Sequence, residues 1–377
     1  MTTKSEQFIN FTNIFLFVLS FITLSFTDTY FISKGVSNIM INLVKYIFLI
    51  LGIFLAFINL ILLHRKKIYI KETIVLVINF LIFLSYTIFL FIINNKIIEF
   101  ESIFSLSYLF LSAIYSYLLI NILDFKVIYN SLVIILIISM FNFVFFEKGI
   151  ELFTIKNILS SSFNNSFSLF ESHYSSGVAF ALCLFFTYFN KNRFFTLLSL
   201  FYVFLTFKRI LLISSIFLFL FTIFFCSSRS FKRNYLNVIM SIIFTIAPLI
   251  YFNILVNDSY GLFDFTLGRS VLLNNLINSE YISYGYNSSN VFLNGKGIEM
   301  DLIRIYLELG FFSLFIFSFC YWLYAGRNIY SLLSMFFIFL NLLFSHSLGS
   351  VFTWIIFLVT ISSININSNE FHRKRFL

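Results

Sequence analysis

Long apolar runs separated by short polar clusters make up most of the chain. A bilayer core needs roughly 20 apolar residues per helix, and several of these runs are shorter than that. Lys208 and Arg209 interrupt 194–226, a stretch of 33 residues that would overshoot the membrane as one helix, so we expect two short spans. The pattern predicts an all-α polytopic membrane protein, with residues 1–377 as one multi-pass domain and about 12 transmembrane helices at 9–27, 44–63, 73–93, 103–123, 127–146, 174–189, 194–207, 210–226, 236–255, 302–323, 329–344 and 351–366.

The composition supports this interpretation. The chain is 60% hydrophobic, 22% aromatic and only 11% charged, whereas a soluble domain carries about 25% charged residues. Intrinsic disorder is also excluded, because it requires low hydrophobicity. The run at 9–27 follows a weakly charged start without a small-residue cleavage motif, so we expect it to be retained.

The net charge of +9 is explained by topology. With the N-terminus inside, the predicted cytoplasmic segments hold fifteen of the 25 Lys and Arg residues and four acidic residues. Cytoplasmic loops are enriched in Lys and Arg, so both termini are predicted to lie in the cytoplasm. The positive charge therefore indicates no nucleic-acid partner.

Two segments predicted to be external are much longer than the other loops, namely 147–175 and 256–300. The second holds five of the twelve glycines. Long loops in compact folds are usually functional or disordered. We therefore expect the protein to act at the external face.

Three basic positions stand out among those outside the predicted cytoplasmic segments, and the third of them is Arg304 in the segment that begins at Gly297. Lys208 and Arg209 occupy the predicted outer turn between two spans, where they either bind an anion or reach the lipid headgroups. Arg269 follows Gly268 in the long loop. Backbone donors and a cation there suit one anion, although a plain surface arginine is an equal alternative.

The segment that begins at Gly297 is the most informative. Asp301, Arg304 and Glu308 are spaced i, i+3 and i+7, which places them on one helical face. A charge at bilayer depth costs at least about 2.5 kcal/mol and usually faces a polar cavity with a partner. We therefore predict a site at Glu299, Asp301, Arg304 and Glu308, with an ion triad that merely orients the helix as the alternative.

Histidines and tyrosines near the predicted outer face are auxiliary candidates. His173 or His346 could act as an acid or base, since histidine is the side chain suited to that near neutral pH, although a lone histidine more often only bonds locally. A tyrosine and asparagine group either stacks on sugar rings or forms a membrane-interface belt. Its members are Tyr281, Tyr284, Tyr286 and Asn287. The four histidines and three cysteines are scattered, so no metal site is predicted.

These motifs resemble the Wzy-type polysaccharide repeat-unit polymerases of the O-antigen ligase/polymerase superfamily. The resemblance rests on the outer turn Thr206-Phe-Lys-Arg, on the pair Gly268-Arg269, and on Gly297-x-Glu-Met-Asp-Leu-Ile followed by Glu308-Leu-Gly. The order of spans and the late position of the long loop are also similar. The resemblance therefore covers nearly the whole chain and implies a GT-C-like architecture.

The resemblance implies a reaction without a cofactor in a bacterial cytoplasmic membrane. One polyprenyl-diphosphate-linked oligosaccharide is transferred to another, with a chain-length regulator and a flippase as accompanying proteins. The diphosphate would be held by Lys208, Arg209, Arg269 and Arg304, and Glu299 or Asp301 would take the acceptor proton. Related ligases are expected to have histidine where Glu299 stands, which favours a polymerase. The alternatives are a lipid-linked glycan ligase and a flippase or other transporter, although no internal repeat of the transporter kind is found.

Overall fold

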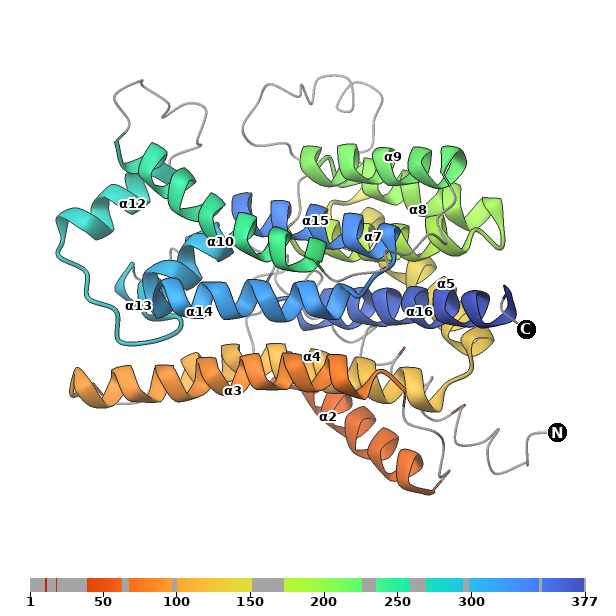
Figure 1. The fold of residues 1–377 in the computed structure, drawn as a ribbon, viewed down its shortest axis with the longest axis horizontal. Coiled ribbons are helices and arrows are strands. Elements are labelled where there is room, and N and C mark those ends of the chain that lie inside the picture. The colour runs from red at the N-terminus through yellow and green to blue at the C-terminus, as the bar shows by residue number, and fades with distance from the viewer. Residues whose placement is uncertain are drawn as a thin grey trace. The chain divides into compact units, whose positions relative to one another are not determined.

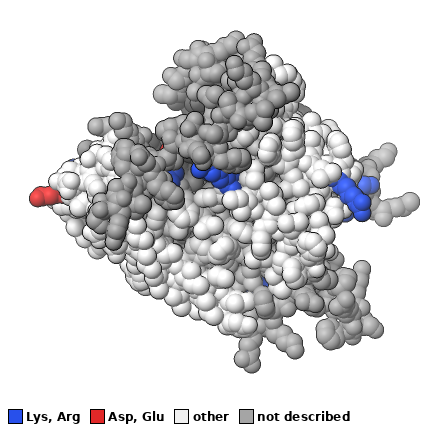
Figure 2. Space-filling view, turned by 90° about the horizontal axis from the view of Figure 1, so that it is seen from above, with Lys and Arg blue, Asp and Glu red and all other residues white. Residues whose placement is uncertain are grey.

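The computed structural model describes residues 39–62, 68–96, 100–150, 173–225, 235–257, 269–293, 298–345 and 348–375, together with Phe11 and Val18. Of residues 39–45, 100–101, 173–174 and 369–375 it describes only the backbone. The regular structure in these ranges is helical. Figure 1 shows the helices, and Figure 2 shows how few charged side chains are visible among the described residues in one view.

Eleven of the twelve predicted runs coincide with a helix, and the run at 9–27 lies outside the described ranges apart from Phe11 and Val18. The elements are α2 (Ile39–Leu62), α3 (Ile70–Ile93), α4 (Phe100–Ile122), α5 (Phe125–Asn142), η2 (Phe143–Glu147), α7 (His173–Phe189), α8 (Arg193–Leu205), α9 (Arg209–Phe224), α10 (Tyr235–Val256), α12 (Arg269–Asn278), α13 (Ser288–Phe292), α14 (Asp301–Ala325), α15 (Ile329–Phe344) and α16 (Val351–Arg375).

Six helices in the described part of the chain are long and apolar enough to cross a membrane. The chain is thus a helical polytopic membrane protein, while the number of twelve spans and the GT-C-like architecture stay predictions. The shorter apolar helices explain the difference in number. The 13 residues of α8 rise only about 20 Å, less than the roughly 30 Å of a bilayer core. The predicted division of 194–226 into two helices is confirmed, because α8 and α9 are separated by Phe207, which has a left-handed φ of 50°. That both helices are membrane spans stays a prediction.

The chain forms two compact units. The first contains Met1–Ile70, Ile114–Phe225 and Phe352–Ile364. Within it α7 packs against α5, α8 and α9. Ile68 and Asn121 exchange two hydrogen bonds, in which the Asn121 amide accepts from the Ile68 N–H at 2.6 Å and donates to its carbonyl at 3.0 Å.

The second unit contains Lys71–Ala113, Cys226–Val351 and Asn365–Leu377. Its α14 packs along α10 and against α15, while α12 contacts α10 and α13 contacts α14 (Figure 1). Aromatic rings fill the contact between α3 and α14, with the Phe83 and Phe317 centroids 5.9 Å apart. Lipid-facing helices need such packing, because lipid supplies no hydrophobic force between them.

Segments predicted to share the outer side of the membrane meet at one end of the second unit. The Leu348 N–H donates to the Asp301 carboxylate at 2.7 Å, and the Asn94 amide donates to the Ser283 carbonyl at 3.2 Å. The side that faces the cytoplasm stays a prediction.

Candidate functional site

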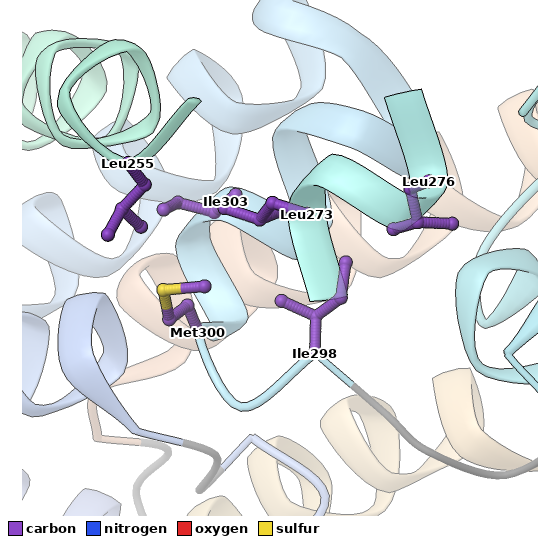
Figure 3. Packing of buried hydrophobic residues seen from close by; sticks show 6 residues of the cluster. All are labelled: Leu255, Leu273, Leu276, Ile298, Met300 and Ile303. Atoms are coloured by element: carbon purple, nitrogen blue, oxygen red, sulfur yellow. The ribbon is translucent and has the colours of Figure 1, made fainter. Parts of the chain in front are cut away.

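A small apolar cluster holds the polar end of the second unit together. Figure 3 shows its side chains converging from α10, α12, the segment before α14 and α14 itself. Each member is at most 2% exposed, and the members are Leu255, Leu273, Leu276, Ile298, Met300 and Ile303. The cluster fixes the start of α14, and with it the charged residues on that helix.

Asp301 and Arg304 form a buried ion pair in the first turn of α14. The Asp301 Oδ1 atom lies 3.2 Å from Arg304 Nη2, and Oδ2 accepts from the Leu348 N–H. Arg304 Nη2 also donates to the Tyr286 hydroxyl at 2.7 Å. The predicted i, i+3 contact is confirmed, and both charged side chains are nearly inaccessible.

Glu308 is buried and binds the start of α13. Its carboxylate accepts from the Asn287 N–H at 2.7 Å, from the Ser289 N–H at 3.1 Å and from the Ser289 hydroxyl at 2.5 Å. The Ser283 hydroxyl donates to the Glu308 carbonyl at 2.5 Å. A carboxylate stabilises the N–H groups at a helix start. Glu308 therefore ties the segment 283–289 to α14.

The tyrosine group covers this network and docks on α3. Gly285 has a φ of 128°, and a Cβ there would lie 2.7 Å from Thr87 Cγ2. Burial raises the pKa of the Tyr281 and Tyr286 hydroxyls and keeps both protonated. Tyr286 is 2% exposed, so it is placed to bond Arg304 and not to stack at the surface. Tyr284 is half-buried, with its ring 5.6 Å from that of Phe91.

Arg269 and Glu299 form a second, more accessible ion pair. Arg269 Nη2 lies 3.5 Å from Glu299 Oε2, and the side chains are 18% and 46% exposed. Arg269 begins α12, and Glu299 lies between the buried Ile298 and Met300. A cation and a carboxylate thus stand side by side within reach of a ligand.

Lys208 and Arg209 belong to the first unit, where the structure separates them by burial. Lys208 is 6% exposed, while Arg209 is exposed and begins α9. In the same unit the Ser175 hydroxyl donates a short hydrogen bond to Glu147. Glu147 is not among the residues predicted from the sequence, although an acidic residue where a long loop begins is a recognisable signal.

The side chains of the two candidate histidines lie outside the described part of the structure. His173 begins α7, but its side chain lies outside the described atoms, and His346 lies outside the described residues altogether, as does Gly268. Among the residues that the structure describes, no group of three His, Cys, Asp or Glu side chains could hold a metal ion.

Comparison with known proteins places the chain in no family. No family model matches the chain, no curated protein matches it, and no solved structure matches it.

Proposed function

We propose that the protein is a membrane-embedded glycosyltransferase that polymerises polyprenyl-diphosphate-linked oligosaccharide repeat units at the external face of a bacterial cytoplasmic membrane. The observation that carries the proposal is the half-exposed Arg269–Glu299 pair with its 3.5 Å separation. The type of reaction is inferred from the resemblance of the segment from Gly297 to Glu308 to the motif of the Wzy-type polymerases. The carbohydrate product would be a surface polysaccharide such as O-antigen or capsule.

The proposed step is a displacement at the anomeric carbon of the donor. The acceptor hydroxyl oxygen bonds to that carbon, and the bond from the carbon to the diphosphate oxygen breaks with its electron pair. Glu299 takes the acceptor proton as general base. Arg269 stabilises the charge on the leaving diphosphate. Diphosphate binding to Arg269 would also release Glu299 from its ion pair.

The buried residues have a supporting role in this proposal. Asp301 and Glu308 accept hydrogen bonds from backbone N–H groups in the segments 287–289 and 348, which suits them to position the site more than to exchange protons with substrate. Lys208 and Arg209 stay proposed as a second diphosphate-binding element.

A groove of about 440 Å³ between α3 and a break in α14 supports a lipid-linked substrate. Gly310, at φ 77° and ψ 175°, interrupts the helix there. The lining is mainly apolar, and a chain of isoprenoid units suits it. Its residues are Ile82, Ser85, Tyr86, Phe89, Leu309, Gly310, Phe311, Phe312 and Ser313.

A deletion strain complemented with point variants tests the proposal. A strain without a polymerase carries single repeat units on the lipid or on the final acceptor, and we expect Glu299→Gln to reduce polymer by roughly 10²- to 10⁴-fold. Arg269→Ala should have a similar effect. The matched control is Glu280→Gln, at an exposed position in the same predicted external loop, 256–300. It should give normal polymer.

The outcomes separate the alternatives. A flippase mutant exposes no repeat units externally, and a ligase mutant makes polymer that stays on the lipid. Normal-length polymer from Glu299→Gln would contradict its role as base.

A further inference from the structure

Two buried hydrogen-bond donors beside Glu308 have no partner in the described structure. They are the Nδ2 atom of Asn287 and the Nε atom of Arg304, and each residue is 5% exposed. Nearly all buried polar atoms in native proteins have a hydrogen-bond partner. Two unsatisfied donors in one neighbourhood therefore indicate a missing acceptor.

The contacts of Asn287 and the helix position of Arg304 place both residues near Glu308. The Asn287 N–H donates to Glu308 at 2.7 Å, and Arg304 lies one helical turn before Glu308 on the same face of α14. Arg304 also bonds the hydroxyl of Tyr286, the residue before Asn287. Both donors thus belong to one cluster of buried polar groups formed by α14 and the segment 283–289.

The charge of this polar cluster selects the kind of hydrogen-bond acceptor that would bind there. Asp301 and Glu308 supply two carboxylates, against the single guanidinium of Arg304. An excess of negative charge disfavours a diphosphate, because like charges repel in a poorly solvated site. Neutral oxygens, such as sugar hydroxyl or amide carbonyl groups, suit the unpaired donors.

We propose that Asn287 and Arg304 form a subsite that binds neutral oxygens of the acceptor sugar. This inference rests on the proposed function, and it assigns the donor and the acceptor of the reaction to two separate places. Arg269 takes the donor diphosphate, and the unpaired donors of Asn287 and Arg304 take a hydroxyl or carbonyl oxygen of the acceptor. Glu299 lies two residues before Asp301, near the start of the same helix.

Binding measurements on the purified full-length protein test whether donor and acceptor bind at separate places. One probe is the free oligosaccharide, released by mild acid from the lipid-linked unit of the deletion strain, and the other is inorganic diphosphate. We expect Asn287→Gly to bind the oligosaccharide at least about tenfold more weakly than wild type, with unchanged diphosphate binding. Arg269→Ala should show the reverse pattern.

Asn287→Gly also distinguishes a binding role from a structural one. Asn287 has a φ of 69°, which glycine adopts without strain, and the Nδ2 atom that is removed has no hydrogen-bond partner to lose. We therefore expect an unchanged unfolding temperature without ligand. A clearly lower unfolding temperature would mean that the amide already has a structural partner, and it would overturn the subsite.

Equal oligosaccharide affinity in Asn287→Gly and wild type, or no binding by wild type, would also overturn the subsite. Neither result affects the proposed polymerase, which fails only if the deletion strain or Glu299→Gln makes normal polymer. Arg304→Lys is a second variant, because it keeps the charge but lacks Nε. It should also weaken oligosaccharide binding.

Discussion

The second unit contains two arginine–carboxylate pairs that differ mainly in burial. Arg304 and Asp301 are separated by 3.2 Å, with side chains 6% and 0% exposed. Arg269 and Glu299 are separated by 3.5 Å, with side chains 18% and 46% exposed. Breaking a buried pair leaves an uncompensated charge, whereas an exposed pair contributes about 0–1 kcal/mol. The same chemistry can therefore serve as a fixed support in one place and as an exchangeable binding group in the other.

The local chain path produces this difference. Ile298 and Met300 both point into the apolar cluster, and Glu299 between them is partly exposed. Asp301 follows as the first residue of α14 and is covered by the turn at Leu348. Two acidic residues only two positions apart thus reach different environments.

Removing the buried carboxylate should have the largest effect on stability. Asp301→Ala leaves the Arg304 guanidinium buried without its ion-pair partner, so we expect the free energy of unfolding to fall by about 3–5 kcal/mol. Thermal or denaturant unfolding of the purified protein measures the change.

Asp301→Asn is the matched control for that variant. It keeps an oxygen that can accept from the Leu348 N–H and loses only the charge, so its effect should be smaller. Wild-type stability of Asp301→Ala would show that the buried pair is no support for the fold.

The sequence predicted one of these two pairs. The i, i+3 spacing of Asp301 and Arg304 predicts their contact, because helix geometry is local. The Arg269–Glu299 pair joins residues 30 positions apart, and no local pattern encodes such a contact. Glu308 is a similar case, because its partners Asn287 and Ser289 lie 21 and 19 residues away.

The apolar runs predicted the helices well and their interruptions less well. The break at Gly310 lies inside the predicted span 302–323, since one glycine in an apolar run does not reveal its own φ. At 207 the adjacent Lys208 and Arg209 gave the necessary signal, and the predicted turn is there.

Two glycines allow a sharper test of how the segment over the buried pair is held. Gly285→Ala meets both a strained φ of 128° and Thr87 Cγ2 at 2.7 Å, whereas Gly310→Ala meets a φ of 77° and open space. Strain alone costs about 1–3 kcal/mol, and overpacking adds about 1–3 kcal/mol. Gly285→Ala should therefore lower the free energy of unfolding more.

Thr87→Ser separates the two contributions, because it removes Cγ2 and keeps the hydroxyl that accepts from the Tyr286 N–H. In the Gly285→Ala background it should restore part of the lost stability. Equal unfolding temperatures for Gly285→Ala and Gly310→Ala would mean that the segment does not dock tightly on α3.

A substitution in the more exposed Arg269–Glu299 pair should cause the smallest change in stability and a large change in activity. Glu299→Gln removes one partner of a half-exposed ion pair, so the free energy of unfolding should change by less than about 1 kcal/mol. The same variant is expected to lose most polymer formation, because an amide cannot take the proton from the acceptor hydroxyl. Measuring unfolding and polymer length on one preparation tests both expectations. A large loss of stability in Glu299→Gln would place this pair with the buried one, as a support of the fold, and the contrast between the two pairs would be wrong.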